Sequence, residues 1–185
     1  MHMPVYFAVL LCALLSENAW AAPPPTTRKT LDQPAAIQGY DCAKGYAWFF
    51  ADGRLSRCTI ERETAFGEIT IPSGSIITLL PDGNPDFVQM SHAAPVRDFV
   101  CQGGSILGPG EGSVVSFYPS GKLKLCFLVR DQEVQGIPCS KGGFLASLNG
   151  PNPGVQFYES GKVHSCRLTR DFAGLPAGTR FRQPQ

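Results

Sequence analysis

Four segments of the chain share one pattern of apolar and polar positions, and this pattern predicts a β-hairpin. In each segment two large apolar residues precede a short polar turn that ends in glycine, and an alternating strand follows. The Asp-Gly or Ser-Gly step supplies the positive φ that closes a tight turn. The four segments are FFADGRLSRCTI (49–60), LLPDGNPDFVQM (79–90), FYPSGKLKLCFL (117–128) and FYESGKVHSCRL (157–168).

The returning strand of each segment carries two apolar residues at alternate positions, which places them on one face of a strand. The alternation is imperfect close to each turn. Pro-containing segments after the returning strands are expected to carry the chain into the next hairpin. The pattern therefore predicts an all-β domain over 37–185, with the hairpins in one continuous sheet. The four expected units are approximately 42–72, 73–100, 101–138 and 139–181.

The first residues have the pattern of an export signal. Residues 4–15 form one apolar run, shorter than the roughly 20 residues of a bilayer span but typical of the centre of a signal peptide. Ala19 and Ala21 supply the small residues before a cleavage site, whereas no Lys or Arg precedes the run. We expect a signal peptide at 1–21, cleaved after Ala21, in a periplasmic or secreted protein. An uncleaved anchor and a buried element are the alternatives.

Residues 22–36 are rich in Pro and Thr, and they are expected to form a flexible tether.

Six cysteines remain beyond residue 21, and an even number in an exported chain indicates disulfides. A metal site is the competing interpretation, but the chain has no CxxC pair and no histidine at ligand spacing from a cysteine. Alignment of the four segments selects the pairing. Three copies contain both cysteines, whereas the second has Ser73 and Val88 in their place. The predicted disulfides are Cys42–Cys58, Cys101–Cys126 and Cys139–Cys166.

The stretches FYPSGKLKLC and FYESGKVHSC, each followed by a polar turn and glycine, resemble MORN-like repeats, including a bacterial variant. In spacing the resemblance covers 42–181, and its motifs are specific around 117–138 and 157–176. It implies an elongated twisted antiparallel sheet of successive β-hairpin repeats that serves as a binding or scaffolding surface, without shared catalytic residues. The chain departs from the family in its longer units, its added cysteines and its lack of a regular Gly-x-Trp or Gly-x-Tyr closure.

Composition narrows the function classes. Aromatic and β-branched residues are spread along the chain, and 43% of it is hydrophobic, so the chain is not expected to be intrinsically disordered. The net charge is +1 and no Lys/Arg stripe is visible in the sequence, which argues against nucleic-acid binding. The same near-neutral charge argues against a membrane role apart from export. A membrane-surface-associated MORN-like protein stays an alternative.

Residues that could perform catalysis are scarce. His92 and His164 occupy positions typical of surface residues, and no G-x-S-x-G motif is present. Glu63, Asp131 and Asp171 recur beside arginines and predict a structural ladder of ion pairs. We expect no catalytic residue, no metal and no cofactor. The rival hypothesis is a small secreted hydrolase that uses Asp and Glu residues.

Adjacent aromatic residues are the remaining candidates. Neighbouring strand residues point to opposite faces, so one member of each pair enters the core while the other can be exposed. Exposed rings stack on sugars or hold a partner protein; alternatively, a second layer covers them. The predicted function is an exported, non-catalytic binding or scaffold module for a protein or an envelope polymer. Its candidate binding residues are Phe117, Tyr118, Phe157 and Tyr158.

Overall fold

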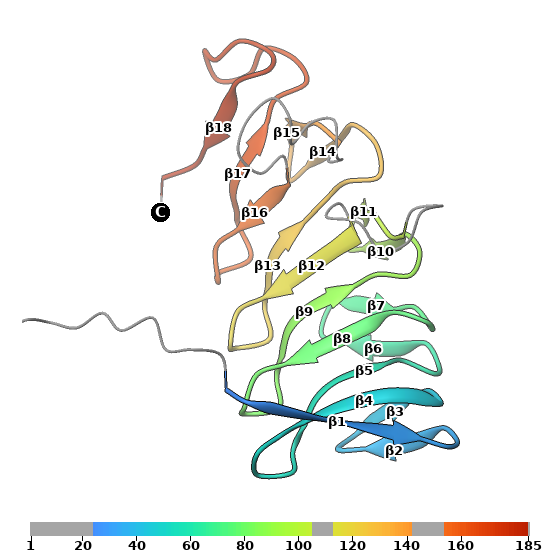
Figure 1. Ribbon diagram of the computed structural model, residues 1–185. Helices are drawn as coiled ribbons and strands as arrows, with labels where there is room; N and C mark the ends of the chain where they lie inside the picture. The colour runs from blue at the N-terminus through green and yellow to red at the C-terminus, as the bar shows by residue number, and fades with distance from the viewer. Residues whose placement is uncertain (1–23, 105–112, 142–153, 185) are drawn as a thin grey trace, which may run out of the picture.

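A computed structural model describes residues 24–104, 113–141 and 154–184, and the predicted signal peptide at 1–21 lies outside these ranges. Ten of its strands form one open, twisted antiparallel sheet, as expected (Figure 1). They are β1 (Thr26–Leu31), β4 (Gly45–Phe50), β5 (Leu55–Thr59), β8 (Ile76–Leu79), β9 (Pro85–Gln89), β12 (Val114–Phe117), β13 (Leu123–Cys126), β16 (Val155–Phe157), β17 (Val163–Arg167) and β18 (Arg180–Arg182), and they neighbour one another in this order.

The pairs β4–β5, β8–β9, β12–β13 and β16–β17 are the four predicted hairpins, here called the long hairpins. Each has a three-residue loop in which the N–H of the third residue, a glycine, donates to the carbonyl three residues earlier, as Gly53 does to Phe50 at 2.9 Å. The four glycines have φ between 78° and 90°. A turn followed by a left-handed glycine is a common hairpin connection, and it explains why glycine recurs there.

Each long hairpin contains a β-bulge at the same place. Trp48 faces Arg57 and Phe49 faces Leu55, so Ser56 has no partner across the strand pair. A bulge re-aims the side chains around it. It therefore accounts for the imperfect alternation near each turn. The corresponding bulged residues are Ser56, Asp86, Lys124 and His164.

The segments expected to be connections form hairpins of their own, here called the short hairpins. They are β2 (Ala35–Ile37) with β3 (Tyr40–Cys42), β6 (Thr64–Phe66) with β7 (Ile69–Ile71), β10 (Ala94–Val96) with β11 (Phe99–Cys101), and β14 (Gln132–Val134) with β15 (Ile137–Cys139). β7 also pairs with β10, so two short hairpins share a four-stranded sheet. The short hairpins form a second layer on one face of the large sheet (Figure 1).

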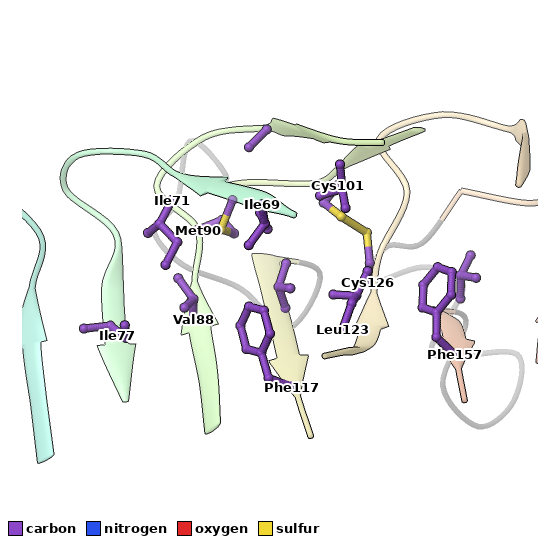
Figure 2. Packing of buried hydrophobic residues seen from close by; sticks show 14 of the residues in the cluster. Ile69, Ile71, Ile77, Val88, Met90, Cys101, Phe117, Leu123, Cys126 and Phe157 are labelled. Atoms are coloured by element: carbon purple, nitrogen blue, oxygen red, sulfur yellow. A yellow bond between two sulfur atoms is a disulfide. The ribbon is translucent and has the colours of Figure 1, made fainter. Parts of the chain in front are cut away.

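The hydrophobic core lies between this second layer and the large sheet (Figure 2). Ile77, Val88 and Val115 face one another across neighbouring strands, and all three are fully buried. Aromatic rings join the two layers. The rings of Phe99 and Phe157 stack with their centroids 5.5 Å apart. The inner face of the sheet is therefore closed by side chains from both layers.

Three disulfides confirm the predicted pairing: Cys42–Cys58, Cys101–Cys126 and Cys139–Cys166. Each links the last residue of a short hairpin to the returning strand of the next long hairpin, as Figure 2 shows for the second pair.

The predicted alignment of the copy without cysteines is wrong at one position. Thr64 pairs with Ile71 as Gln132 pairs with Cys139, so Ile71, and not Ser73, corresponds to the first cysteine. Ile71 and Val88 are both fully buried, and Ile71 points toward Val88 and Met90 (Figure 2). An apolar contact thus occupies the place of the disulfide.

Glutamine amides bind the turns of two short hairpins to the long hairpins beneath them. Gln135 Oε1 accepts the N–H of Val163 at 3.0 Å, and its Nε2 donates to the carbonyl of Gly161 at 2.8 Å. Gln38 Oε1 accepts the N–H of Leu55 at 3.1 Å. Both glutamines have a positive φ, 52° for Gln38 and 53° for Gln135. These side-chain bonds help to offset the cost of that backbone conformation.

The prediction of a flexible tether at 22–36 is wrong, because β1 and the start of β2 lie within these residues. β1 pairs with β4 over six residues. Its threonines favour a strand, and β4 offers an unpaired row of backbone groups. The unit boundaries also differ from expectation. Residues 42, 101 and 139, which were expected to begin units, are the last residues of short hairpins, and residue 73 follows one.

A fourth disulfide tests this architecture. We expect I71C+V88C to form a disulfide in the oxidised protein and to raise the free energy of unfolding by about 2 kcal/mol, because these positions match the native pairs in register. S73C+V88C is the matched control and should retain free thiols. Non-reducing peptide mapping and urea denaturation provide the readouts. A disulfide in the control but not in I71C+V88C would contradict the register.

Candidate binding face

The face of the ten-stranded sheet that points away from the short hairpins is here called the outer face (Figure 1). Residues that face each other on neighbouring strands point their side chains to the same side of the sheet, so the outer-face side chains form rows across the strands. One row crosses all ten strands and consists of Arg28, Trp48, Arg57, Thr78, Phe87, Ser116, Leu125, Gln156, Ser165 and Arg182.

The two predicted aromatic pairs divide between the faces of the sheet. Phe117 and Phe157 are 4% and 2% exposed and belong to the core, so they are corrected from candidate binding residues to structural ones. Tyr118 and Tyr158 follow them at the ends of their strands, and both are half-buried. The hydroxyl of Tyr118 donates to the carbonyl of Phe157 at 2.8 Å. The candidate set thus retains the two tyrosines.

A shallow groove of about 340 Å³ crosses the outer face over β12, β13, β16 and β17. Its polar side chains include those of Tyr118, Lys124 and His164. Lys124 Nζ lies 5.6 Å from the centroid of the Tyr118 ring, and the rings of Tyr158 and His164 are 4.5 Å apart. Lys124 and His164 are the bulged residues of their hairpins. The groove therefore presents Tyr118 beside Lys124, together with His164, whose ring contacts Tyr158 next to the groove.

A second cluster lies on β1, β4 and β5. The guanidinium of Arg28 lies 4.4 Å from the centroid of the Tyr46 ring, and that of Arg57 lies 5.2 Å from Trp48. Tyr46 and Trp48 are edge-to-face, with centroids 6.3 Å apart. Arg57 Nε and the hydroxyl of Thr78, which faces Arg57 on β8, are buried and have no hydrogen-bond partner in the described part of the chain. Polar atoms buried in this way are uncommon in native proteins.

Arginines gather at the other end of the row, on β17 and β18. Arg167 faces Arg180 directly across the strand pair, and Arg182 faces Ser165. Arg180 donates to the hydroxyl of Ser165 at 3.0 Å. Burial, and then the charge of Arg182, lowers the pKa of Arg180 below its ordinary value. Like charges directly opposite each other are unfavourable in a strand pair, so this end of the row concentrates positive charge.

Sequence reasoning did not identify either arginine cluster. Arg28, Tyr46, Trp48 and Arg57 come from three strands, and only the strand register brings them together. The one available signal was the alternation of Tyr46, Trp48 and Phe50, which places their side chains on one face of a strand.

The acidic residues stabilise turns and short hairpins. Arg62 pairs with Asp41 at 2.8 Å and Arg170 pairs with Glu133. The predicted ladder is wrong, because Glu63, Asp131 and Asp171 form no ion pair in the described part of the chain. Asp131 and Asp171 accept backbone N–H groups instead, from Lys141 at 2.7 Å and Ala177 at 2.9 Å. In the first long-hairpin turn, Asp52 binds Arg54, whose hydrogen bonds lower the pKa of the carboxyl group.

His92 is exposed, and its Nδ1 lies 3.0 Å from the hydroxyl oxygen of Ser91. The hydroxyl of Ser91 donates its single proton to the carbonyl of Ser73 at 2.7 Å. The proton of Ser91 is therefore directed at Ser73 and not at His92, whereas a general base would receive it. Within the described ranges, no group of three His, Cys, Asp or Glu side chains is arranged to hold a metal ion.

No family model, curated protein or solved structure matches this chain. The candidate face is therefore defined by its own geometry.

Tyr118 offers a pH test of the groove. Burial, and then the charges of Glu159 and Tyr158, raises the pKa of Tyr118 above its ordinary value of 10.0. The folded protein thus favours the protonated phenol, so this contribution to stability is complete below pH 10 and is lost as the pH rises through the raised pKa. We expect the difference in unfolding free energy between wild type and Y118F to be constant from neutral pH to about 9 and to fall above about 10. Urea denaturation across this range measures it, and a difference that grows above pH 10 would contradict the assignment.

Proposed function

We propose that the chain is an exported, non-catalytic binding or scaffold module that presents the outer face of its large sheet to a protein or an envelope polymer. The observation that carries this proposal is the asymmetry of the two faces: the short hairpins pack on one, and exposed or half-buried aromatic and cationic side chains line the other. Extended open sheets with such side chains suit large ligands better than small ones.

The disulfides indicate an oxidising compartment, extracellular or periplasmic. Export through a signal peptide at 1–21, with cleavage after Ala21, is the part of the proposal that explains how the chain reaches such a compartment. Across the described ranges, no helix has the length and apolar character of a bilayer span.

We also propose that the chain is a hairpin-repeat protein of the MORN-like kind. The four long hairpins support this proposal, because they share loop geometry, bulge position and register. The short hairpins between them lengthen each unit, and the disulfides join the two kinds of hairpin.

The described carboxylates favour a binding module over the rival hydrolase. Asp41 and Glu133 pair with arginines, and Asp131 and Asp171 cap backbone N–H groups. A glycosidase-type mechanism requires two carboxyl groups that flank a substrate, one of them with a raised pKa. Carboxylates engaged in local structure are poorly suited to that role.

Site-specific photo-cross-linking in producing cells tests which face binds. A photoreactive residue replaces Ser116 or Gln156 in the groove, or Val129, which is exposed and lies beside β11 on the short-hairpin side. We expect covalent adducts from the two groove positions and none from position 129. Adducts from position 129 alone, or from no position, would contradict the proposal.

A further inference from the structure

The outer face is predominantly cationic, although the net charge of the protein is only +1. The strand registers place six cationic side chains on the outer face and, among the strand residues described there, one acidic residue, Asp86. The acidic residues discussed above lie in turns and short hairpins instead. The cationic residues of the outer face are Arg28, Arg57, Lys124, Arg167, Arg180 and Arg182.

Several of these cations contact rings rather than carboxylates. Arg28, Arg57 and Lys124 each lie within 6 Å of an aromatic centroid, at 4.4, 5.2 and 5.6 Å. A ring holds a cation in place without neutralising its charge. The positive charge at these three positions therefore remains available to an anionic ligand.

One further feature shows polar groups without a partner. Arg57 Nε and the hydroxyl of Thr78, which face each other on β5 and β8, are buried without a hydrogen-bond partner in the described chain. Burial without a partner costs free energy in the unliganded protein, and an anionic, hydroxyl-rich ligand at this position relieves that cost. At the other end of the row, Arg167 and Arg180 face each other across β17 and β18 and concentrate positive charge there.

The rest of the central row is polar rather than apolar. Ser116, Gln156 and Ser165 lie between the two arginine clusters. Tyr46, at 52%, is the one outer-face residue among the exposed large hydrophobic side chains of the described chain. Hydroxyl and amide groups beside aromatic rings suit sugars.

We propose that the outer face binds an acidic polysaccharide that lies across the strands. This inference rests on the proposed function and names its ligand class. Sugar carboxylates pair with Arg28 and Arg57 at one end and with the arginines of β17 and β18 at the other. Sugar rings lie against Trp48 and Tyr118. Neighbouring strands are about 4.8 Å apart, so the two clusters are separated by roughly 30 to 40 Å. Binding should therefore strengthen with polymer length, because one chain engages both clusters.

The probe for the experiment is polygalacturonate, a linear polyuronate, and fully methyl-esterified polygalacturonate is the uncharged match. In a W20F background Trp48 is the only tryptophan, so its fluorescence reports binding at the face itself. We expect binding of polygalacturonate, weaker binding of short oligomers, and about tenfold loss of affinity when NaCl rises from about 50 to about 200 mM.

R28Q+R57Q should raise the Kd for polygalacturonate about tenfold. The matched control R54Q+R62Q removes the same charge from two arginines that pair with Asp52 and Asp41 away from the outer face, and it should leave the Kd nearly unchanged. K124Q provides a second, single-site variant in the groove. Circular dichroism and non-reducing peptide mapping verify that each variant is folded and oxidised.

Several outcomes would overturn the inference. Equal loss of affinity in both double variants, or equal binding of the methyl-esterified polymer, would remove the role of the arginine cluster. Tighter binding of single-stranded DNA, or of vesicles containing phosphatidylglycerol, would assign the face to phosphate ligands. Absence of polygalacturonate binding while groove positions still cross-link in cells would overturn the ligand class alone. Loss of the cross-links as well would overturn the proposed function.

Discussion

An antiparallel sheet of ten strands has two faces, and the short hairpins of this chain bury one of them. Every structural feature described above depends on that packing. The inner face supplies fully buried residues such as Ile77 and Val115, and the short hairpins supply Phe99 and Ile71. The core of a sheet this long is one extended layer, so each short hairpin must be held to the strands beneath it. Disulfides do this at three places and an apolar contact at the fourth.

The long hairpins and the disulfides could be predicted because their signals are local. A glycine with positive φ marks each loop, and a cysteine pair is either complete or absent in each copy. The short hairpins escaped prediction because their strands have three residues and their turns have two. In two of these turns both residues have a positive φ, and the first of them is a glutamine, a residue that is not typical of that conformation. The placement of Ser73, instead of Ile71, opposite the first cysteine of the other copies has the same origin. Ile71 is the last residue of β7, and without this strand the copies cannot be aligned correctly.

The candidate site could be predicted in part. Tyr118 and Tyr158 follow from the alternation of adjacent strand residues, and so does the burial of Phe117 and Phe157. The arginine clusters could not be predicted, because residues as distant as Arg28 and Arg57 meet only through the register of β1, β4 and β5. The bulges add to the difficulty, since each shifts the register by one residue. A chain with a net charge of +1 therefore gave no sign that six of its cations share one face.

The central claim is that one face of the sheet is buried and the other is open to ligands. Hydroxyl-radical footprinting of the disulfide-bonded protein, read by mass spectrometry, measures the solvent exposure of individual side chains and so tests this claim. The account predicts rapid oxidation of Tyr46, Trp48 and Tyr118, with protection of Phe117 and Phe157 until the protein unfolds. Oxidation of the two phenylalanines at rates similar to those of the tyrosines would show that the short hairpins do not cover the inner face, and it would contradict the account.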